Sequence, residues 1–155
     1  MFEIPKKIVK RPYEAVWILH SDTSLEEQKK IIGKNKEVIE SFSGSLRHVD
    51  SWGKRRLANP IKKNLRANYF YATFEADAAA ISELERTLRI NDKVLRFLHV
   101  RLKEGTDLDK HLEQFRDLLS ESAKRDRERE AKAQRRSAAR AAGGMPGPGK
   151  PAPRP

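Results

Sequence analysis

The chain has 155 residues, no cysteine and a formal net charge of +11, with 33 Lys or Arg against 22 Asp or Glu. This length fits one domain with some additional chain, and the absence of cysteine excludes disulfides, thiol nucleophiles and cysteine metal sites. The charge favours a polyanionic partner. No apolar run approaches the ~20 residues needed to cross a bilayer, and the N-terminus lacks the apolar stretch of a secretory signal. We therefore expect a cytoplasmic protein with no membrane contact.

The predicted elements begin after a short N-terminal extension, residues 1–10. The stretch from Tyr13 to His20 is rich in aromatic and β-branched residues and predicts a strand. Ser24 and Glu27 have the spacing of a capping box, and apolar residues at helical intervals predict a helix from about 25 to 42. Gly44 is placed to end that helix in the left-handed conformation.

The segment from Trp52 to Lys63 interleaves five cations with four apolar side chains. A second strand, from Leu46 to Trp52, is predicted to run into it. Gly53 indicates a bend or a bulge, and Pro60 belongs at the edge or the end of a strand. Two interpretations remain open: a rigid basic surface suited to a phosphate backbone, and an edge strand whose cations prevent pairing between sheets.

The second half of the pattern contains one more strand, a helix and a last strand. Residues 64–68 contain turn formers, and residues 69–74 predict the third strand by propensity. Asp77 is predicted to start the second helix, which Asn91-Asp92 ends. Residues 94–102 predict the fourth strand.

The order β-α-β-β-α-β predicts an α+β, ferredoxin-like fold, in which two helices cover one face of a four-stranded antiparallel sheet. The other face is then free for a partner or for solvent. We expect this domain over residues 11–104, a helical and charged C-terminal extension over 105–142, and a disordered Pro/Gly-rich tail over 143–155. Whether the extension forms one helix or two stays open.

No set of residues points to catalysis. The four histidines are scattered without metal-ligand spacing, the carboxylates are spaced as solvated helix faces, and no phosphate-binding glycine pattern or serine nucleophile elbow is present. The sequence therefore predicts no enzyme, no cofactor and no metal site. The positions concerned are His20, His48, His99 and His111.

The RNA-recognition motif has the same order of elements and stacks bases on aromatic residues of its third strand. Its glycine-flanked basic-aromatic pattern is missing from this chain. Aromatic residues in alternation more often pack in the core and across strands, so we do not predict base stacking. The aromatic residues in question are Tyr69, Phe70, Tyr71 and Phe74.

The segment from Gly53 to Lys62 resembles the most specific motif of the bacterial small-subunit ribosomal protein six family. That motif is a glycine, a variable residue, two polar or basic residues, Leu, Ala or Ser, Tyr, a variable residue, Ile and a basic residue, and here Asn59 replaces the tyrosine. The resemblance covers about residues 11–103. Further matches are Tyr13-Glu14, Trp52, Tyr69-Phe70 and the stretch from Leu88 to Arg96.

The resemblance implies a non-catalytic constituent of the small ribosomal subunit. It implies binding to the central domain of small-subunit ribosomal RNA as a heterodimer with small-subunit protein eighteen, with no small-molecule substrate. Phosphate contacts of this kind position a protein without reading bases. The candidate RNA-binding residues lie in or beside the matching segments and are Lys54, Arg55, Arg56, Lys62, Lys63, Arg89 and Arg96.

Three questions stay open beside this resemblance. Asn59 cannot pack or stack as a tyrosine does, so the local contact is expected to differ. Residues 123–155 hold 10 Lys or Arg against 3 Asp or Glu, unlike the short acidic tail of some family members. This segment either adds contacts to ribosomal RNA or to a neighbouring ribosomal protein, or is a solvated extension. The alternative function is an RNA-binding regulator outside the ribosome.

Overall fold

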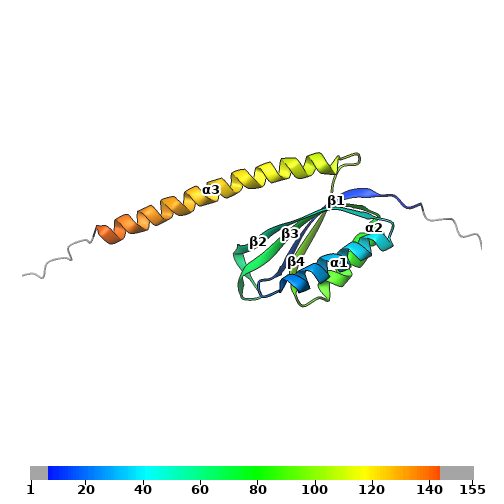
Figure 1. Ribbon diagram of the computed structural model, residues 1–155, viewed down its shortest axis with the longest axis horizontal. Helices are drawn as coiled ribbons and strands as arrows, with labels where there is room; N and C mark the ends of the chain where they lie inside the picture. Colours follow the sequence, from blue (N-terminus) through cyan, green and yellow to red (C-terminus); the bar gives the residue numbers. More distant parts are fainter. Residues whose placement is uncertain (1–6, 144–155) are drawn as a thin grey trace, which may run out of the picture. The chain divides into compact units, whose positions relative to one another are not determined.

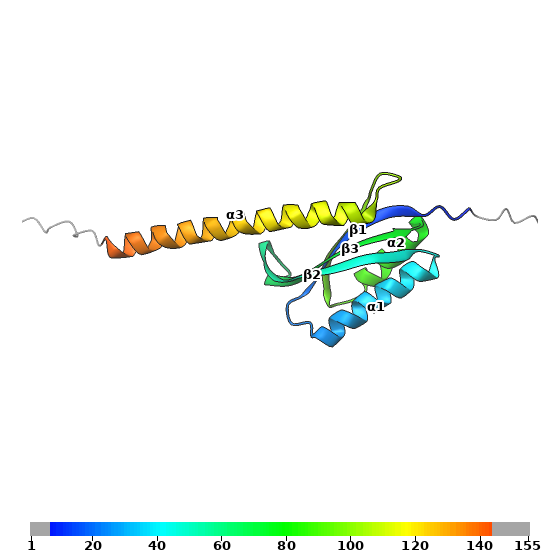
Figure 2. The ribbon, with the colours of Figure 1, turned by 45° about the horizontal axis from the view of Figure 1, so that its top comes forward.

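The computed structural model describes residues 7–143, and its strands form one antiparallel sheet in the order β2-β3-β1-β4. Helices α1 and α2 cover one face of this sheet (Figure 1, Figure 2). The ferredoxin-like α+β prediction is confirmed. The elements are β1 (Arg11–His20), α1 (Leu25–Ser41), β2 (Ser45–Ile61), β3 (Asn64–Ala76), α2 (Ala78–Arg89), β4 (Val94–Arg101) and α3 (Leu108–Ala142).

The main core lies between the sheet and these two helices. Side chains of a strand alternate between the two faces, so every second residue of β1 and β3 is buried against the helical layer. Trp17 and Phe74 are 1% and 0% exposed, and burial of a large apolar side chain stabilises the fold by roughly 2–3 kcal/mol. The strand residues of this core are Tyr13, Ala15, Trp17, Leu19, Phe70, Ala72, Phe74 and Ala76.

Helix α1 begins at the predicted capping box. The Ser24 hydroxyl accepts from the backbone N–H of Glu27 at 3.2 Å, and the Glu27 carboxylate accepts from the backbone N–H of Ser24 at 2.9 Å. The prediction for the other end is wrong, because Ser43, not Gly44, has the left-handed φ of 61°. Gly44 is needed for a different reason: a Cβ there would lie 2.7 Å from the carbonyl oxygens of Ile39 and Glu75.

The turn between β2 and β3 also differs from the prediction. Residues 64–68 belong to β3, and the turn is Lys62-Lys63, whose φ angles of 47° and 65° are both left-handed. Two such residues are typical of the hairpin turn whose twist matches that of its strands. The Asn64 side-chain amide donates to the carbonyl oxygens of Ile61 and Lys62, at 3.1 and 3.2 Å, and holds this turn. β2 therefore continues through the basic segment, with Pro60 near the end of this edge strand as predicted.

Helix α3 is one continuous helix. By its internal contacts the chain divides into two compact units, and the boundary between Leu112 and Glu113 falls within this helix. Its first turn belongs to the unit of the sheet, since Leu108 and Leu112 are 5% and 3% exposed. Within residues 7–143, no helix is long and apolar enough to cross a membrane. Residues 1–6 of the predicted N-terminal extension, and residues 144–155 of the tail predicted to be disordered, lie outside the described part of the chain.

Candidate nucleic-acid interface

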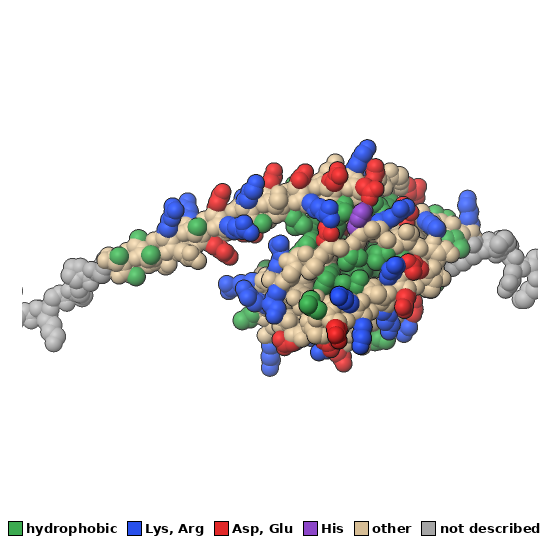
Figure 3. Space-filling model, in the orientation of Figure 1, with side chains coloured by type: hydrophobic (Ala, Val, Ile, Leu, Met, Phe, Trp, Pro, Cys, Tyr) green, Lys and Arg blue, Asp and Glu red, His purple; other side chains and the backbone are tan. Residues whose placement is uncertain are grey.

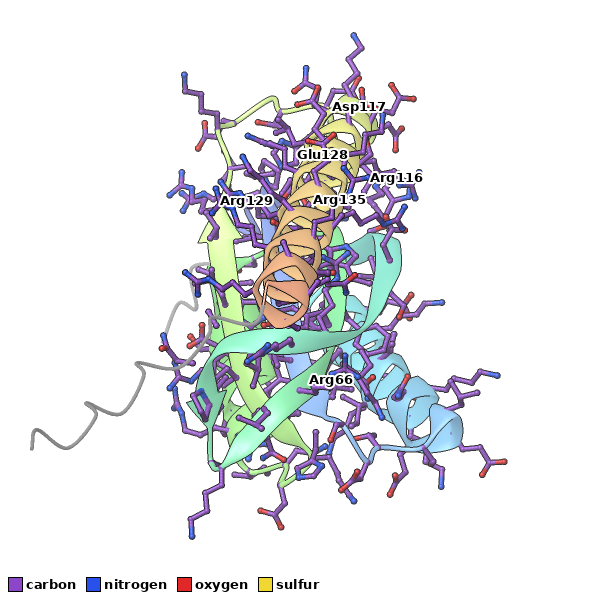
Figure 4. The ribbon with its side chains drawn as sticks, turned by 90° about the vertical axis from the view of Figure 1, so that its left-hand side faces the viewer. Arg66, Arg116, Asp117, Glu128, Arg129 and Arg135 are labelled. Carbon is purple, nitrogen blue, oxygen red and sulfur yellow. The ribbon has the colours of Figure 1, made fainter. Side chains whose placement is uncertain are left out.

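The outer part of the β2–β3 hairpin, residues 53–66, carries six exposed cations and no acidic residue. We call this segment the basic hairpin. Figure 3 shows Lys and Arg side chains gathered over its end. Five of the six were predicted from the sequence. The sixth, Arg66 (Figure 4), was missed because residues 64–68 were interpreted as a turn. The six are Lys54, Arg55, Arg56, Lys62, Lys63 and Arg66.

Two of these cations face each other across the hairpin. Arg56 pairs directly with Arg66 in the register of β2 and β3. Side chains directly opposite in an antiparallel pair have Cβ atoms about 5 Å apart, and like charges at this distance destabilise the pair. Protection of an edge strand needs charged side chains on that strand but does not need a second cation opposite them on its neighbour. The arrangement therefore favours the interpretation as an anion-binding surface, because a bound phosphate would relieve this repulsion.

Arg55 is oriented by the aromatic side chain that precedes it. Its guanidinium carbon lies 5.7 Å from the centroid of the Trp52 ring, and its Nε donates to the carbonyl oxygen of Trp52 at 3.3 Å. Trp52 in turn stacks on Tyr71 and Tyr69, with ring centroids 5.7 and 6.1 Å apart. The predicted bulge at Gly53 is confirmed by a shift in register and a φ of 72°. The charge of Arg55 is thus held on a fixed aromatic support.

A small second core anchors the basic hairpin to the rest of the sheet. Leu57 of β2 and Leu95 of β4 are 7% and 8% exposed and cluster with the fully buried Ala67 of β3. Partly buried apolar side chains, including Ile61 beside the turn, pack against this cluster. The cations between these apolar residues therefore project from a packed segment. This is the arrangement that the alternation of cations and apolar groups in the sequence predicts.

The two predicted cations outside the hairpin lie on opposite sides of the sheet. Arg96 is exposed on β4 and pairs with Ile18, which also pairs with Tyr69 of β3. Its neighbour Phe97 packs on the main core, so alternation directs Arg96 to the other face. Arg89 ends α2, and its guanidinium carbon lies 5.8 Å from the Phe97 ring on the helical side. Arg89 therefore does not share the face of Arg96.

The sequence predicted that the sheet face opposite α1 and α2 would be free. In the structure, part of this face is covered. The first turn of α3 is bound to it by two histidine–carboxylate pairs. His111 donates to Glu14 at 2.8 Å, and His48 lies 2.6 Å from a carboxylate oxygen of Asp109. Burial, together with the hydrogen bond to Glu14, raises the pKa of the Tyr71 phenol well above its ordinary value. The polar side chains on this part of the face therefore have their hydrogen-bond partners within the protein.

Across residues 7–143, no group of three or more His, Asp or Glu side chains is placed to hold a metal ion. The buried imidazole of His99 accepts from the indole of Trp17 and donates to Glu85, both at 3.2 Å. Burial lowers its pKa. It connects the sheet to α2 and lies away from the basic hairpin.

Known proteins resemble this chain over the sheet and its two helices. The profile of the ribosomal protein S6 family matches residues 12–101. Small ribosomal subunit protein bS6 of Bdellovibrio bacteriovorus is 59% identical over 118 residues, which are 76% of this chain and 78% of the relative. The bS6 protein of Geotalea daltonii is 46% identical over 94 residues, 61% of this chain and 73% of the relative.

A solved structure supports the fold alone. The crystal structure of 30S ribosomal protein S6 from Thermotoga maritima has a TM-score of 0.57 and 24% sequence identity to this chain. The match covers 71% of this chain and 99% of that protein.

Proposed function

We propose, because this chain belongs to the ribosomal protein S6 family, that it binds the central domain of small-subunit ribosomal RNA together with small-subunit protein eighteen. Membership makes it an RNA-binding constituent of the small ribosomal subunit that serves translation. The finer assignment includes a role without catalytic turnover, on the bacterial ribosome in the cytoplasm. The basic hairpin is the surface that we assign to the RNA.

The opposed pair of Arg56 and Arg66 is the observation that supports this assignment best. The folded hairpin holds two like charges against each other, at a cost to its own stability that a phosphate between them would remove. Arginine suits this role because its planar guanidinium binds phosphate in a bidentate manner. The remaining hairpin cations, Arg89 and Arg96 would add phosphate contacts that position the protein without reading bases.

The alternative of an RNA-binding regulator outside the ribosome receives less support. Such a protein would use exposed aromatic side chains of the sheet to stack bases. Here Tyr71 is 1% exposed, and Trp52 lies stacked between Tyr71 and Tyr69. These rings stack on one another within the protein, and the Trp52 ring also contacts the guanidinium of Arg55. The aromatic residues therefore act as structural support for cations.

A binding titration on a central-domain RNA fragment tests the proposal. Affinity is measured with and without protein eighteen at two salt concentrations, for the wild-type chain and two triple variants. One variant replaces Lys54, Arg56 and Arg66 by Gln. The control replaces Lys29, Lys30 and Lys34 by Gln, which removes the same charge from exposed positions of α1.

We expect tight binding only with the partner, and a salt slope that falls by about 2–3 in the hairpin variant, close to one unit per lost phosphate contact. The control is expected to retain the wild-type slope. Equal and weak binding to any RNA, with or without the partner, would overturn the proposal. Equal losses of RNA affinity in the two triple variants would show that the basic hairpin is not the RNA-binding surface.

A further inference from the structure

Helix α3 carries a second set of cations, which the basic hairpin does not account for. With 3.6 residues per turn, its members fall within an arc of about 80° on one side of the helix. At 1.5 Å per residue they span roughly 22 Å. All are exposed, and four of the five are arginines. We call this set the cation stripe; it consists of Arg125, Arg129, Lys132, Arg136 and Arg140.

The side chains of the stripe share a surface in the folded helix. Four cations of the stripe, from Arg129 to Arg140, line one open pocket together with the small residues Ala133, Ser137 and Ala139. The small residues between the cations let a partner approach the helix closely. Arg135, which is not part of the stripe, projects from a different side of α3 than Arg129 (Figure 4).

The charge pattern of the stripe opposes the stability of a lone helix. Lys132, Arg136 and Arg140 follow one another at intervals of four residues, and like charges at this interval repel by about 0.2–0.5 kcal/mol per pair. Lys132 has one acidic neighbour at this interval, Glu128, but between Glu130 and Ala142 there is no acidic residue to offset the charges of Arg136 and Arg140. A helix that is merely solvated gains from charges of alternating sign. The first half of α3 differs, since its acidic residues outnumber its cations between Leu108 and Glu121.

The chemistry of the stripe excludes two other classes of partner surface. A helix that lies in a membrane interface buries Trp, Phe or Leu, whereas residues 123–142 contain no apolar side chain larger than Ala. Single-stranded nucleic acid is bound by stacking on aromatic side chains, and the last aromatic residue of α3 is Phe115. A row of arginines along one side of a helix instead suits the regularly spaced phosphates of a nucleic-acid double helix.

We propose that the cation stripe binds the phosphate backbone of an RNA double helix. This inference rests on the RNA-bound setting proposed above and adds a second contact, separate from the basic hairpin. Each arginine would donate two hydrogen bonds to a phosphate, and the release of counterions makes the affinity depend on salt. The contact would be independent of base sequence, because contacts to phosphates carry no information about the bases.

Two full-length variants of equal charge test this inference. The first replaces Arg129, Arg136 and Arg140 of the stripe by Gln. The second replaces the other cations of residues 123–142, namely Lys124, Arg127 and Arg135, by Gln. Gln is a good helix former, and far-ultraviolet circular dichroism shows whether both variants keep the helix. Affinity for a ribosome-unrelated RNA duplex is then measured over a range of salt concentrations.

For the stripe variant we expect the slope of log K against log salt concentration to fall by about 2–3, and for the other variant by less than about 1. Equal changes in the two variants would mean that net charge alone acts, which would overturn the proposal. An unchanged slope in both would also overturn it. The proposal would also be overturned if the stripe variant no longer bound small subunits but bound the RNA duplex as the wild-type chain does. The partner of the stripe would then be a protein.

A parallel titration separates this inference from the proposed function. The wild-type chain and both variants are bound to the central-domain fragment in the presence of protein eighteen. If no partner-dependent binding occurs, the proposed function fails, while the difference between the variants on the unrelated duplex still decides the role of the stripe. If partner-dependent binding occurs and the variants behave alike on the duplex, only the stripe proposal fails.

Discussion

His111, in the first turn of α3, donates from Nε2 to a carboxylate oxygen of Glu14 in β1, 2.8 Å away and 97 residues earlier in the chain. The same oxygen accepts a hydrogen bond from the Tyr71 hydroxyl of β3, also at 2.8 Å. One carboxylate thus joins two strands to the start of a helix. The consequence is that the first turn of α3 belongs to the folded domain, whereas the cation stripe lies further along the same helix.

Replacing Glu14 by Gln is expected to loosen this junction. The change removes the charge that both donors share, and because the pair is about one-quarter exposed we expect a loss of about 1 kcal/mol in unfolding free energy. Urea denaturation measures the loss, and hydrogen exchange of the amides of residues 108–112 is expected to accelerate. The control is Asp109→Asn, at a carboxylate that is 79% exposed, with an expected loss below about 0.5 kcal/mol. Equal effects of the two variants would contradict this account.

His99 is expected to make stability depend on pH. Burial lowers its pKa in the folded protein below the ordinary 6.5, against a smaller opposite effect of Glu85. The unfolded chain therefore binds a proton first as pH falls, so the stability is fully present above about pH 6.5 and is lost below it. We therefore expect the unfolding free energy to decrease from about pH 7.5 to pH 5.5 because of this residue.

Unfolding free energies of the wild-type chain and His99→Gln at several pH values test this expectation. Gln retains a donor and an acceptor for Glu85 and Trp17 but does not titrate. The variant is expected to be less stable at every pH and to have a flatter dependence below pH 6.5. A dependence as steep as that of the wild-type chain would assign the effect to the other histidines.

The order of elements was predictable because each element has a strong local signal. The capping box at Ser24 and Glu27, and the aromatic run of β3, depend on neighbours within a few residues. The turn at Lys62-Lys63 had no such signal, since lysine rarely adopts positive φ. Its left-handed residues are stabilised by strand pairing on both sides and by Asn64. The sequence interpretation therefore placed the turn too late.

The candidate site was predictable only where position along the chain and position in space coincide. Five hairpin cations lie in one continuous segment, and the sequence located them. Arg66 was missed because its relation to Arg56 depends on the register of two strands. Arg89 and Arg96 are close in sequence, yet the boundary between α2 and β4 separates them to different sides of the sheet. The contact of His111 with Glu14 depends on the path of the chain beyond β4.

Two glycines, one inside α1 and one just after its end, are expected to respond in opposite ways to alanine. A Cβ at Gly33, inside α1, meets no atom within 4 Å, whereas at Gly44 it would lie 2.7 Å from two carbonyl oxygens. Gly33→Ala is expected to stabilise the fold by about 0.5–1 kcal/mol through helix propensity. Gly44→Ala is expected to destabilise it by about 1–3 kcal/mol, because backbone atoms must move. Thermal unfolding measures both, and a stabilising Gly44→Ala would refute the close packing at the end of α1.

Leu57 is expected to control the rigidity of the basic hairpin. Leu57→Ala removes a side chain that is 7% exposed and packed in the second core, so we expect a loss of about 2–3 kcal/mol. RNA affinity is expected to fall although no charge changes, because the cations then project from a less ordered segment. Hydrogen exchange of residues 53–66 measures the ordering. Leu95→Ala, in the same cluster but on β4, serves as the comparison, and unchanged exchange in both variants would separate the second core from the order of the hairpin.

Relief of the opposed pair is expected to increase stability and to weaken RNA binding at the same time. Arg56→Gln and Arg66→Gln each remove one of two like charges that face each other across the hairpin, so each is expected to stabilise the fold by about 0.5 kcal/mol. Each also removes one phosphate contact, which should lower the salt slope of RNA binding by about 1. Lys30→Gln, on exposed α1, is expected to change neither quantity. A cross-strand pair that served only to protect the edge would gain stability on substitution while the RNA affinity stayed at its wild-type value, so the two measurements together decide whether this repulsion is maintained for a bound phosphate.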